Sequence, residues 1–202
     1  IILFGTPGDF KSLEMIKKLK FPAIKISSGL VNNYPLIAEA AKTKLPIIIS
    51  TGMAYLNEIK DAIKTIKRNR NKKYAILKCT SLYPAPPSEI NLKVIKNLIS
   101  KFNNIPIGYS DHANNHDACL GAVSLGAKII EKHITLDKNL KVPDQKVSID
   151  PNEFKQKIEF FKNNKCDLLI SSRYTKNSEI IGWPYSRKLL SFFSNKFAKF
   201  FL

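Results

Sequence analysis

Two histidines stand where consecutive apolar runs of the sequence end. Ser110-Asp111-His112 follows the run at 105–109, and His133 lies in the run at 128–134. Neighbouring strands of a sheet lie about 4.8 Å apart, so both imidazoles could reach one divalent cation from the same edge. Two imidazole ligands leave positions open for water or substrate oxygens, as a catalytic metal requires. The other interpretation is that each histidine makes a structural hydrogen bond.

Lys25 lies inside another apolar run, at 23–27. An unpaired ammonium group is costly to bury, so Lys25 should have an anionic partner. One alternative is a salt bridge within the fold, to Glu131 or to Asp111. The other is a phosphate or carboxylate group of a ligand. The sequence leaves both alternatives open.

Small hydroxyl residues follow the ends of most of the apolar runs. Such side chains and their backbone amides can donate hydrogen bonds to one shared anion. Any one of them is ordinary loop chemistry, but six at the ends of successive runs indicate an anion site. The six are Thr6, Ser28, Thr51, Thr80, Ser81 and Ser110.

The elements that must position these residues alternate along the chain. Short runs rich in Ile, Val and Leu predict strands, and longer segments with apolar residues spaced by three and four predict helices. This alternation is typical of parallel strands covered by helices and joined by right-handed crossovers. The predicted strands lie near 1–4, 23–27, 46–50, 74–79, 105–109 and 128–134, and the predicted helices near 9–19, 33–43, 55–69, 89–101, 115–125 and 151–163.

Polar residues at the end of nearly every strand favour a barrel, since an open doubly wound sheet usually gathers its ligand contacts at one switch point. The sequence also contains neither GxGxxG nor GxxxxGK[ST], so it does not support a nucleotide phosphate site. A complete (β/α)8 barrel takes about 250 residues, and this chain has 202. We therefore expect an α/β fold of the TIM-barrel type that is incomplete at its amino-terminal end, with about six βα units. The predicted domains are a barrel at 1–170 and a linker or helical tail at 171–202.

The composition limits the partners and the compartment. The net charge is +17, but the lysines are spread over most of the predicted helices, so we expect no nucleic-acid partner. Three cysteines without a CxxC pair, together with the absence of a signal-like segment, predict a reducing cytoplasm. The aromatic segment 189–202 is too short and too charged to span a bilayer. It is compatible with a docked amphipathic helix, a partner contact or a surface-seeking tail.

Several motifs in order resemble the N-acetylneuraminate synthase family over roughly residues 1–160. That resemblance implies a TIM barrel that condenses phosphoenolpyruvate with an N-acylated amino-sugar aldehyde, typically N-acetylmannosamine, and releases phosphate. It also implies a divalent ion, Mn²⁺ before Mg²⁺ or Co²⁺, and a homodimer. The motifs are Lys25-Ile26-Ser27-Ser28-Gly29, Ile49-Ser50-Thr51-Gly52-Met53, Cys79-Thr80-Ser81-Leu82-Tyr83-Pro84-Ala85-Pro86, Gly108-Tyr109-Ser110-Asp111-His112, Glu131-Lys132-His133-Ile134-Thr135-Leu136-Asp137 and Pro143-Asp144.

The resemblance also implies roles for particular residues. His112 and His133 would be the metal ligands and, with Lys25, the catalytic residues. Tyr83 and Asp144 would face the sugar acceptor. The residues implied in holding phosphoenolpyruvate are Thr6, Lys25, Ser28, Thr80, Ser81 and Ser110, with Thr51 as a weaker member of the same shell.

One departure from the family pattern concerns the acceptor. Leu30 stands where the family usually has an acidic residue that contacts the acceptor, which leaves acceptors for legionaminic-type or pseudaminic-type acids open. Two further hypotheses also remain open at this point. The chain could be a catalytically silent relative that serves as a binding or assembly scaffold, or another phosphoenolpyruvate-condensing synthase of deoxy-sugar acids.

Overall fold

The computed structural model describes residues 2–114, 117–163 and 168–172. Its strands form one sheet in which every neighbouring pair is parallel and the spatial order follows the order along the chain. This is the strand arrangement of a TIM barrel. The strands are β1 (Ile24–Ile26), β2 (Ile47–Ser50), β3 (Tyr74–Cys79), β4 (Ile107–Asp111), β5 (Ile129–His133) and β6 (Leu168–Ser172).

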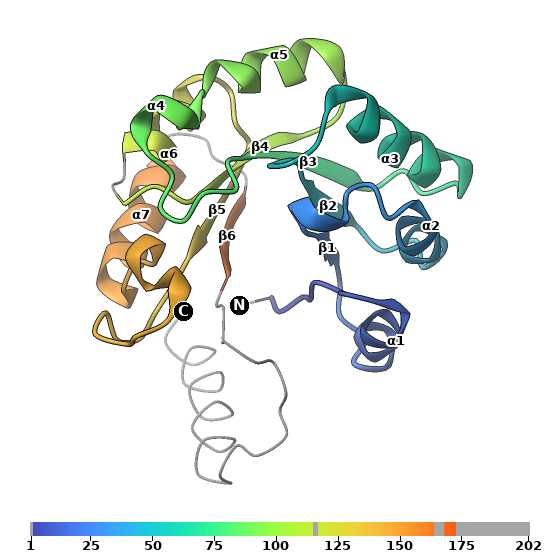
Figure 1. The fold of residues 1–202 in the computed structure, drawn as a ribbon, viewed down its shortest axis with the longest axis horizontal. Helices are drawn as coiled ribbons and strands as arrows, with labels where there is room; N and C mark the ends of the chain where they lie inside the picture. The colour runs from blue at the N-terminus through green and yellow to red at the C-terminus, as the bar shows by residue number, and fades with distance from the viewer. Residues whose placement is uncertain (1, 115–116, 164–167, 173–202) are drawn as a thin grey trace, which may run out of the picture.

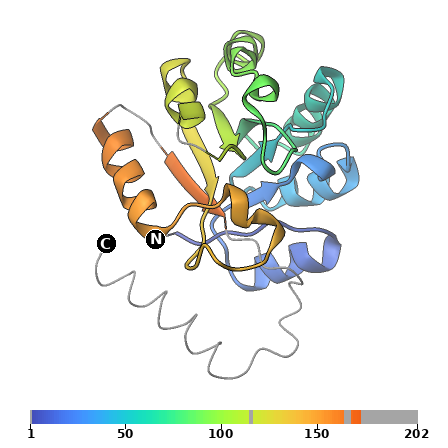
Figure 2. The same ribbon diagram turned by 60° about the vertical axis from the view of Figure 1, so that its left-hand side comes forward.

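The helices cover the outer, convex face of the curled sheet, and the inner face is open on one side (Figures 1 and 2). The architecture is therefore that of an incomplete TIM barrel, as the sequence predicted. The helices are α1 (Phe10–Lys18), α2 (Tyr34–Lys42), α3 (Leu56–Arg68), α4 (Pro87–Ile90), α5 (Lys93–Lys101), α6 (Asp117–Ser124) and α7 (Pro151–Asn163), with 3-10 turns η1 (Ser28–Leu30) and η2 (Pro143–Val147).

The hydrophobic core lies between the sheet and the helices. Alternate strand residues such as Ile49 and Ile76 point outward into this core, where they are fully buried. The helices complete it with residues spaced by three and four, as Ile59 and Ile63 of α3 show. The strand residues in between point to the inner face, so each strand presents one set of side chains to the core and the other set to the barrel interior.

Two expectations about the elements need correction, and one strand was missed. Residues 2–4 form no strand, and the segment pairs with β1 only through a bridge between Gly5 and Ile24. With Ile2 and Leu3 exposed, the apolar run gains too little burial to order a strand. The helix predicted at 89–101 is divided into α4 and α5, because Asn91 adopts the left-handed conformation with φ 43°. β6 was not predicted at all.

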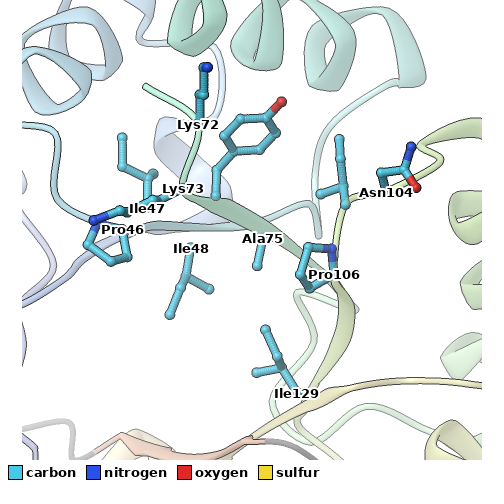
Figure 3. A pocket seen from close by; sticks show the side chains of 11 residues that line it. Pro46, Ile47, Ile48, Lys72, Lys73, Ala75, Asn104, Pro106 and Ile129 are labelled. Atoms are coloured by element: carbon cyan, nitrogen blue, oxygen red, sulfur yellow. The ribbon is translucent and has the colours of Figure 1, made fainter. Parts of the chain in front are cut away.

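The amino ends of the strands enclose an apolar hollow of about 330 Å³ on the inner face of the sheet. Figure 3 shows Ile48, Ala75 and Ile129 facing this hollow, with Pro46 and Pro106 at its edge. Both prolines directly precede a strand, where their missing N–H groups remove no ladder hydrogen bond.

The described residues include no helix that is both long enough and apolar enough to cross a membrane. The tail predicted at 171–202 lies outside the described residues from 173 onward.

Candidate functional site

The two histidines predicted to bind a metal come together at the carboxyl end of the sheet. His133 is the last residue of β5, and His112 directly follows β4. Their ring centroids lie 5.3 Å apart, and both side chains are buried. Tyr83 stacks on His112 with a centroid distance of 4.0 Å and meets His133 edge-on at 5.6 Å. The rim of the half-barrel thus holds a compact group of three rings.

Hydrogen bonding fixes the tautomer of His112. Its Nδ1 lies 2.6 Å from the backbone oxygen of Thr80. A carbonyl oxygen only accepts, so Nδ1 carries the proton and Nε2 keeps a free lone pair. Burial lowers the pKa of His112 below its ordinary value, which favours the neutral ring. A neutral imidazole with one anchored nitrogen and one free nitrogen is suited to ligate a metal.

His133 has a different environment. Its Nδ1 is buried and makes no hydrogen bond, and the nearest acidic oxygen is Oδ2 of Asp144 at 3.7 Å, which is also without a partner. Burial, followed by the neighbouring His112, lowers the pKa of His133 to about 3. Burial also raises the pKa of Asp144. Two unpaired buried polar atoms facing each other indicate that this part of the site is completed by a ligand or ion.

Lys25 has the protein partner that one of the two alternatives predicted. Its Nζ donates to Oγ of Ser50 at 2.7 Å and lies 3.5 Å from Oε2 of Glu131. Ser110 donates to the other oxygen of the same carboxylate at 2.6 Å. All four side chains are buried on the inner face of β1, β2, β4 and β5. They form a chain of charge-assisted hydrogen bonds across the rim.

A cradle of small groups surrounds Gly52, directly after β2. Gly52 N–H donates to Oγ of Ser28 at 2.9 Å. A Cβ at position 52 would lie 2.3 Å from Oγ of Ser81, 2.9 Å from Oγ of Ser28 and 3.2 Å from Sγ of Cys79. The two hydroxyls, the thiol and the backbone amide are thus packed closely around position 52, and a larger residue there would force Ser81 to move.

The remaining predicted residues lie around this rim in less direct positions. Thr51 donates its hydroxyl to the backbone oxygen of Leu77 at 3.1 Å. Thr80 accepts from Nζ of Lys78 at 2.6 Å and turns its hydroxyl to the backbone oxygen of Glu89. Thr6 is exposed and follows Gly5, whose oxygen accepts from Lys25 N–H. Thr51 and Thr80 therefore use their hydroxyls within the protein.

Within the described part of the chain, no three His, Cys, Asp or Glu side chains are grouped closely enough to hold a metal ion. A metal held by His112 and His133 would therefore have two protein ligands and would take its other ligands from water or substrate. The buried, neutral rings and the unpaired atoms of His133 and Asp144 fit such an ion.

The model of the NeuB family matches residues 1–168. The chain belongs to this family. It is 43% identical to the N,N'-diacetyllegionaminic acid synthase of Campylobacter jejuni over 77% of its own length and 47% of the relative's. It is 41% identical to the N-acetylneuraminate-9-phosphate synthase of Drosophila melanogaster over 73% of its own length and 40% of the relative's. The chain thus spans less than half the length of these relatives.

The fold comparison agrees with the family. The crystal structure of an N-acetylneuraminic acid synthetase from Leptospira borgpetersenii, in complex with citrate, superposes with a TM-score of 0.78 at 31% identity. The match covers 95% of this chain and 64% of that one. The predicted resemblance to the N-acetylneuraminate synthase family is confirmed, and the half-barrel is the part of the NeuB fold that this chain contains.

Sequence analysis missed Ser50 and Cys79 as side chains of this NeuB-family site, and it named Glu131 only as a possible salt-bridge partner of Lys25. Ser50 and Cys79 are the last residues of β2 and β3, and Glu131 lies two residues before His133. Each faces the inner side, and strand alternation would have shown it: Glu131 must share a face with His133, and Ser50 with Ile48. Leu30, the departure from the family pattern, packs in part against the core cluster under α1 and α2.

Proposed function

We propose that this chain is the barrel part of a synthase that condenses phosphoenolpyruvate with an N-acylated amino-sugar aldehyde. The product is a sialic acid or a related nonulosonic acid, and the second product is phosphate. The observation that supports this most directly is the gathering of His112, His133 and the Lys25–Glu131 chain on one rim of a NeuB-family half-barrel. The names of the relatives supply the reaction class.

Lys25 and the Gly52 cradle are suited to hold phosphoenolpyruvate. The ammonium group offers a charge-assisted donor, and the hydroxyls of Ser28 and Ser81 offer two further donors beside Gly52, whose own amide donates to Ser28. Binding both the carboxylate and the phosphate of one small molecule fixes its C3 relative to the acceptor. Orientation of this kind contributes a large share of the rate of a bimolecular reaction.

His112 and His133 would hold a divalent ion, with Mn²⁺ as the preferred ion and Mg²⁺ or Co²⁺ as alternatives. When bound, that ion polarises the aldehyde oxygen of the acceptor as a Lewis acid. The protein's part is to keep both imidazoles neutral and to anchor Nδ1 of His112 on Thr80. Tyr83 and Asp144 stand beside the two rings, where an acceptor would lie.

The reaction then balances as follows. C3 of phosphoenolpyruvate forms a bond to the aldehyde carbon, water adds at C2, and the C2–O bond to phosphate breaks to leave a carbonyl group at C2. The two protons of the water end on the former aldehyde oxygen, which becomes a hydroxyl group, and on the departing phosphate. The added water must lose a proton, and Glu131 is a carboxylate at the rim whose two oxygens are already oriented by Ser110 and Lys25. We assign Glu131 the role of orienting this water and accepting its proton.

The direct test is turnover by this chain. Phosphoenolpyruvate, Mn²⁺ and either N-acetylmannosamine or a 2,4-diacetamido hexose would be incubated with the protein, and phosphate release and the mass of the sugar acid would be measured. The proposal expects release that depends on both Mn²⁺ and acceptor and that is lost in Glu131→Gln. Binding of phosphoenolpyruvate without turnover would instead support the catalytically silent scaffold.

The quaternary state and the compartment are part of the same proposal. We propose a homodimer that acts in the cytoplasm and has no nucleic-acid partner, because the basic residues are distributed over the helices and do not form one stripe. Sedimentation of the protein, with and without phosphoenolpyruvate, measures the association state.

A further inference from the structure

A buried ion pair lies directly behind the two histidines. Asp111 and Lys132 each precede one histidine in the sequence, and they are direct partners in the register of β4 and β5. Nζ of Lys132 lies 2.7 Å from Oδ2 of Asp111. Their exposed fractions are 0% for Asp111 and 1% for Lys132. Since strand residues alternate in direction, the pair faces the helices while the histidines face the barrel interior.

The same pair holds the backbone that follows His112. Nζ of Lys132 also donates to the backbone oxygen of Ala113 at 2.5 Å. Oδ1 of Asp111 accepts from the backbone N–H of Ala113 at 2.9 Å and from the hydroxyl of Tyr109 at 3.1 Å. Both backbone groups of Ala113 are therefore tied to the pair. A rotation or shift of the chain at His112 would break these bonds.

His133 has no comparable anchor of its own. Nδ1 of His112 is fixed on Thr80, whereas Nδ1 of His133 has no hydrogen bond. The position of the His133 ring thus depends on the backbone of β5, which pairs with β4 up to Lys132 and with β6 up to His133, and whose His133 oxygen accepts from Ile149 N–H at 2.9 Å. Beside the backbone pairing of β4 and β5, the ion pair adds a side-chain link between the two strands, one residue before each histidine.

We propose that Asp111 and Lys132 are positioning residues that set the separation of the two metal-binding imidazoles. The inference rests on the metal site of the proposed function. With only two protein ligands, the affinity of the site depends strongly on their mutual geometry. A buried ion pair adds little net stability over an apolar pair of the same size, so stability alone does not account for this one.

The test is a titration with Co²⁺, whose visible absorption reports the ligand geometry directly and needs no substrate. The variant is Asp111→Asn combined with Lys132→Met, which removes both charges together. Asn keeps an acceptor for Ala113 N–H and Tyr109, and Met keeps most of the lysine's volume. Loss of residues that orient metal ligands typically weakens metal binding by about 10- to 100-fold, and we expect that range with an altered absorption band.

The matched control is Ile130→Ala. Ile130 lies on the same strand and the same face as Lys132, two residues earlier, and is fully buried. Its truncation lowers the melting temperature without touching the strand ends. We expect the affinity for Co²⁺ and the absorption band to stay as in the unaltered chain. An equal loss of affinity in Ile130→Ala would overturn the inference, because general loosening of the core would then explain both results.

The other outcomes are also decisive. A folded double variant with unchanged affinity and spectrum overturns the positioning role and leaves the metal site intact. If the unaltered chain binds no Co²⁺, the metal site of the proposed function fails, and the inference fails with it. If the double variant does not fold, Asp111→Asn alone decides, since it removes the charge that pairs with Lys132 and keeps an acceptor for Ala113 N–H. A shifted band with weaker binding supports the role, and an unchanged titration overturns it.

Discussion

The two ends of the inner face are built from the same strands and have opposite chemistry. At the amino end, Ile48 of β2 and Ile129 of β5 line an apolar hollow. Two residues further along the same strands, Ser50 and Glu131 take part in the hydrogen-bonded chain at the rim. Since both pairs share one face, the change occurs within a single step of the strand period. The amino end therefore carries the packing of the scaffold, and the carboxyl end carries the polar groups available for chemistry.

Lys25→Met tests the difference between the polar carboxyl end and the apolar amino end most strongly. Loss of one member of a buried charged contact to a ligand typically costs about 2–5 kcal/mol, so phosphoenolpyruvate should bind roughly 100-fold more weakly. Calorimetry on the folded variant measures this. The matched control is Lys72→Met at the hollow, an exposed lysine whose loss should leave the affinity unchanged. Equal effects of the two substitutions would remove the distinction between the two ends.

A substitution at the apolar hollow should lower stability and leave the affinity for phosphoenolpyruvate unchanged. Ile129→Ala removes buried apolar volume, and such truncations cost about 2–5 kcal/mol of stability. We expect about 2 kcal/mol, because Ile129 borders an existing hollow to which its neighbours can adjust. Urea unfolding measures the loss, and the affinity for phosphoenolpyruvate should not change. A fall in affinity at unchanged stability would place Ile129 in the site and contradict the division.

Gly52→Ala probes the rim without changing any charge. The added methyl group would lie 2.3 Å from Oγ of Ser81, so Ser81 must move away from the cradle. We expect phosphoenolpyruvate to bind about 10-fold more weakly, which corresponds to roughly 1.4 kcal/mol. Binding of Mn²⁺ should be unaffected, because neither histidine contacts this point. Unchanged phosphoenolpyruvate affinity would show that the cradle does not hold the anion.

The rim should also make stability depend on pH, whereas the apolar hollow cannot. The pKa of His133 falls from its ordinary 6.5 to about 3 on folding, so below pH 6.5 the unfolded chain binds a proton that the folded chain does not. Above pH 6.5 His133 is neutral in both states and does not reduce the free energy of unfolding. As the pH falls from 6.5 toward 3, the unfolded chain gains the proton first, and the free energy of unfolding decreases. Between pH 7 and 5.5 the metal-free protein should lose about 1 kcal/mol through His133.

Urea unfolding at both pH values, with His133→Asn as the comparison, isolates this contribution. The variant should show a smaller loss than the unaltered chain. An identical loss in both would mean that His133 is protonated as easily in the folded protein as in the unfolded chain, and is therefore not buried and neutral.

Most of the fold could be predicted from local pattern. The strands at 23–27, 46–50, 74–79, 105–109 and 128–134 are confirmed within a few residues, because short Ile-rich runs bounded by Pro and polar residues carry the signal themselves. The prediction fails for strands whose formation depends on pairing and burial against segments distant in the sequence. An apolar run at 1–4 has the composition of a strand without the burial, and β6 is a short run whose pairing with β5 is visible only in the sheet.

The site was predictable in part for the same reason. The positions of His112 and His133 at strand ends indicated that they would meet, and they do. The sequence left Glu131 and Asp111 as equal candidates to pair with Lys25, and the structure selects Glu131. Strand alternation explains the choice, since Asp111 points to the helices and pairs with Lys132 there. Which hydroxyls face the site depends on loop geometry that no local pattern encodes.

The central claim is that His112 and His133 form one metal site next to an anion site. Calorimetric titration of Mn²⁺, followed by phosphoenolpyruvate, into the chain and into His112→Ala combined with His133→Ala tests it most directly. We expect Mn²⁺ binding that is lost in the double variant, and phosphoenolpyruvate binding that survives there in part through Lys25. Mn²⁺ binding of equal strength in both proteins, or none in a folded unaltered chain, would contradict it.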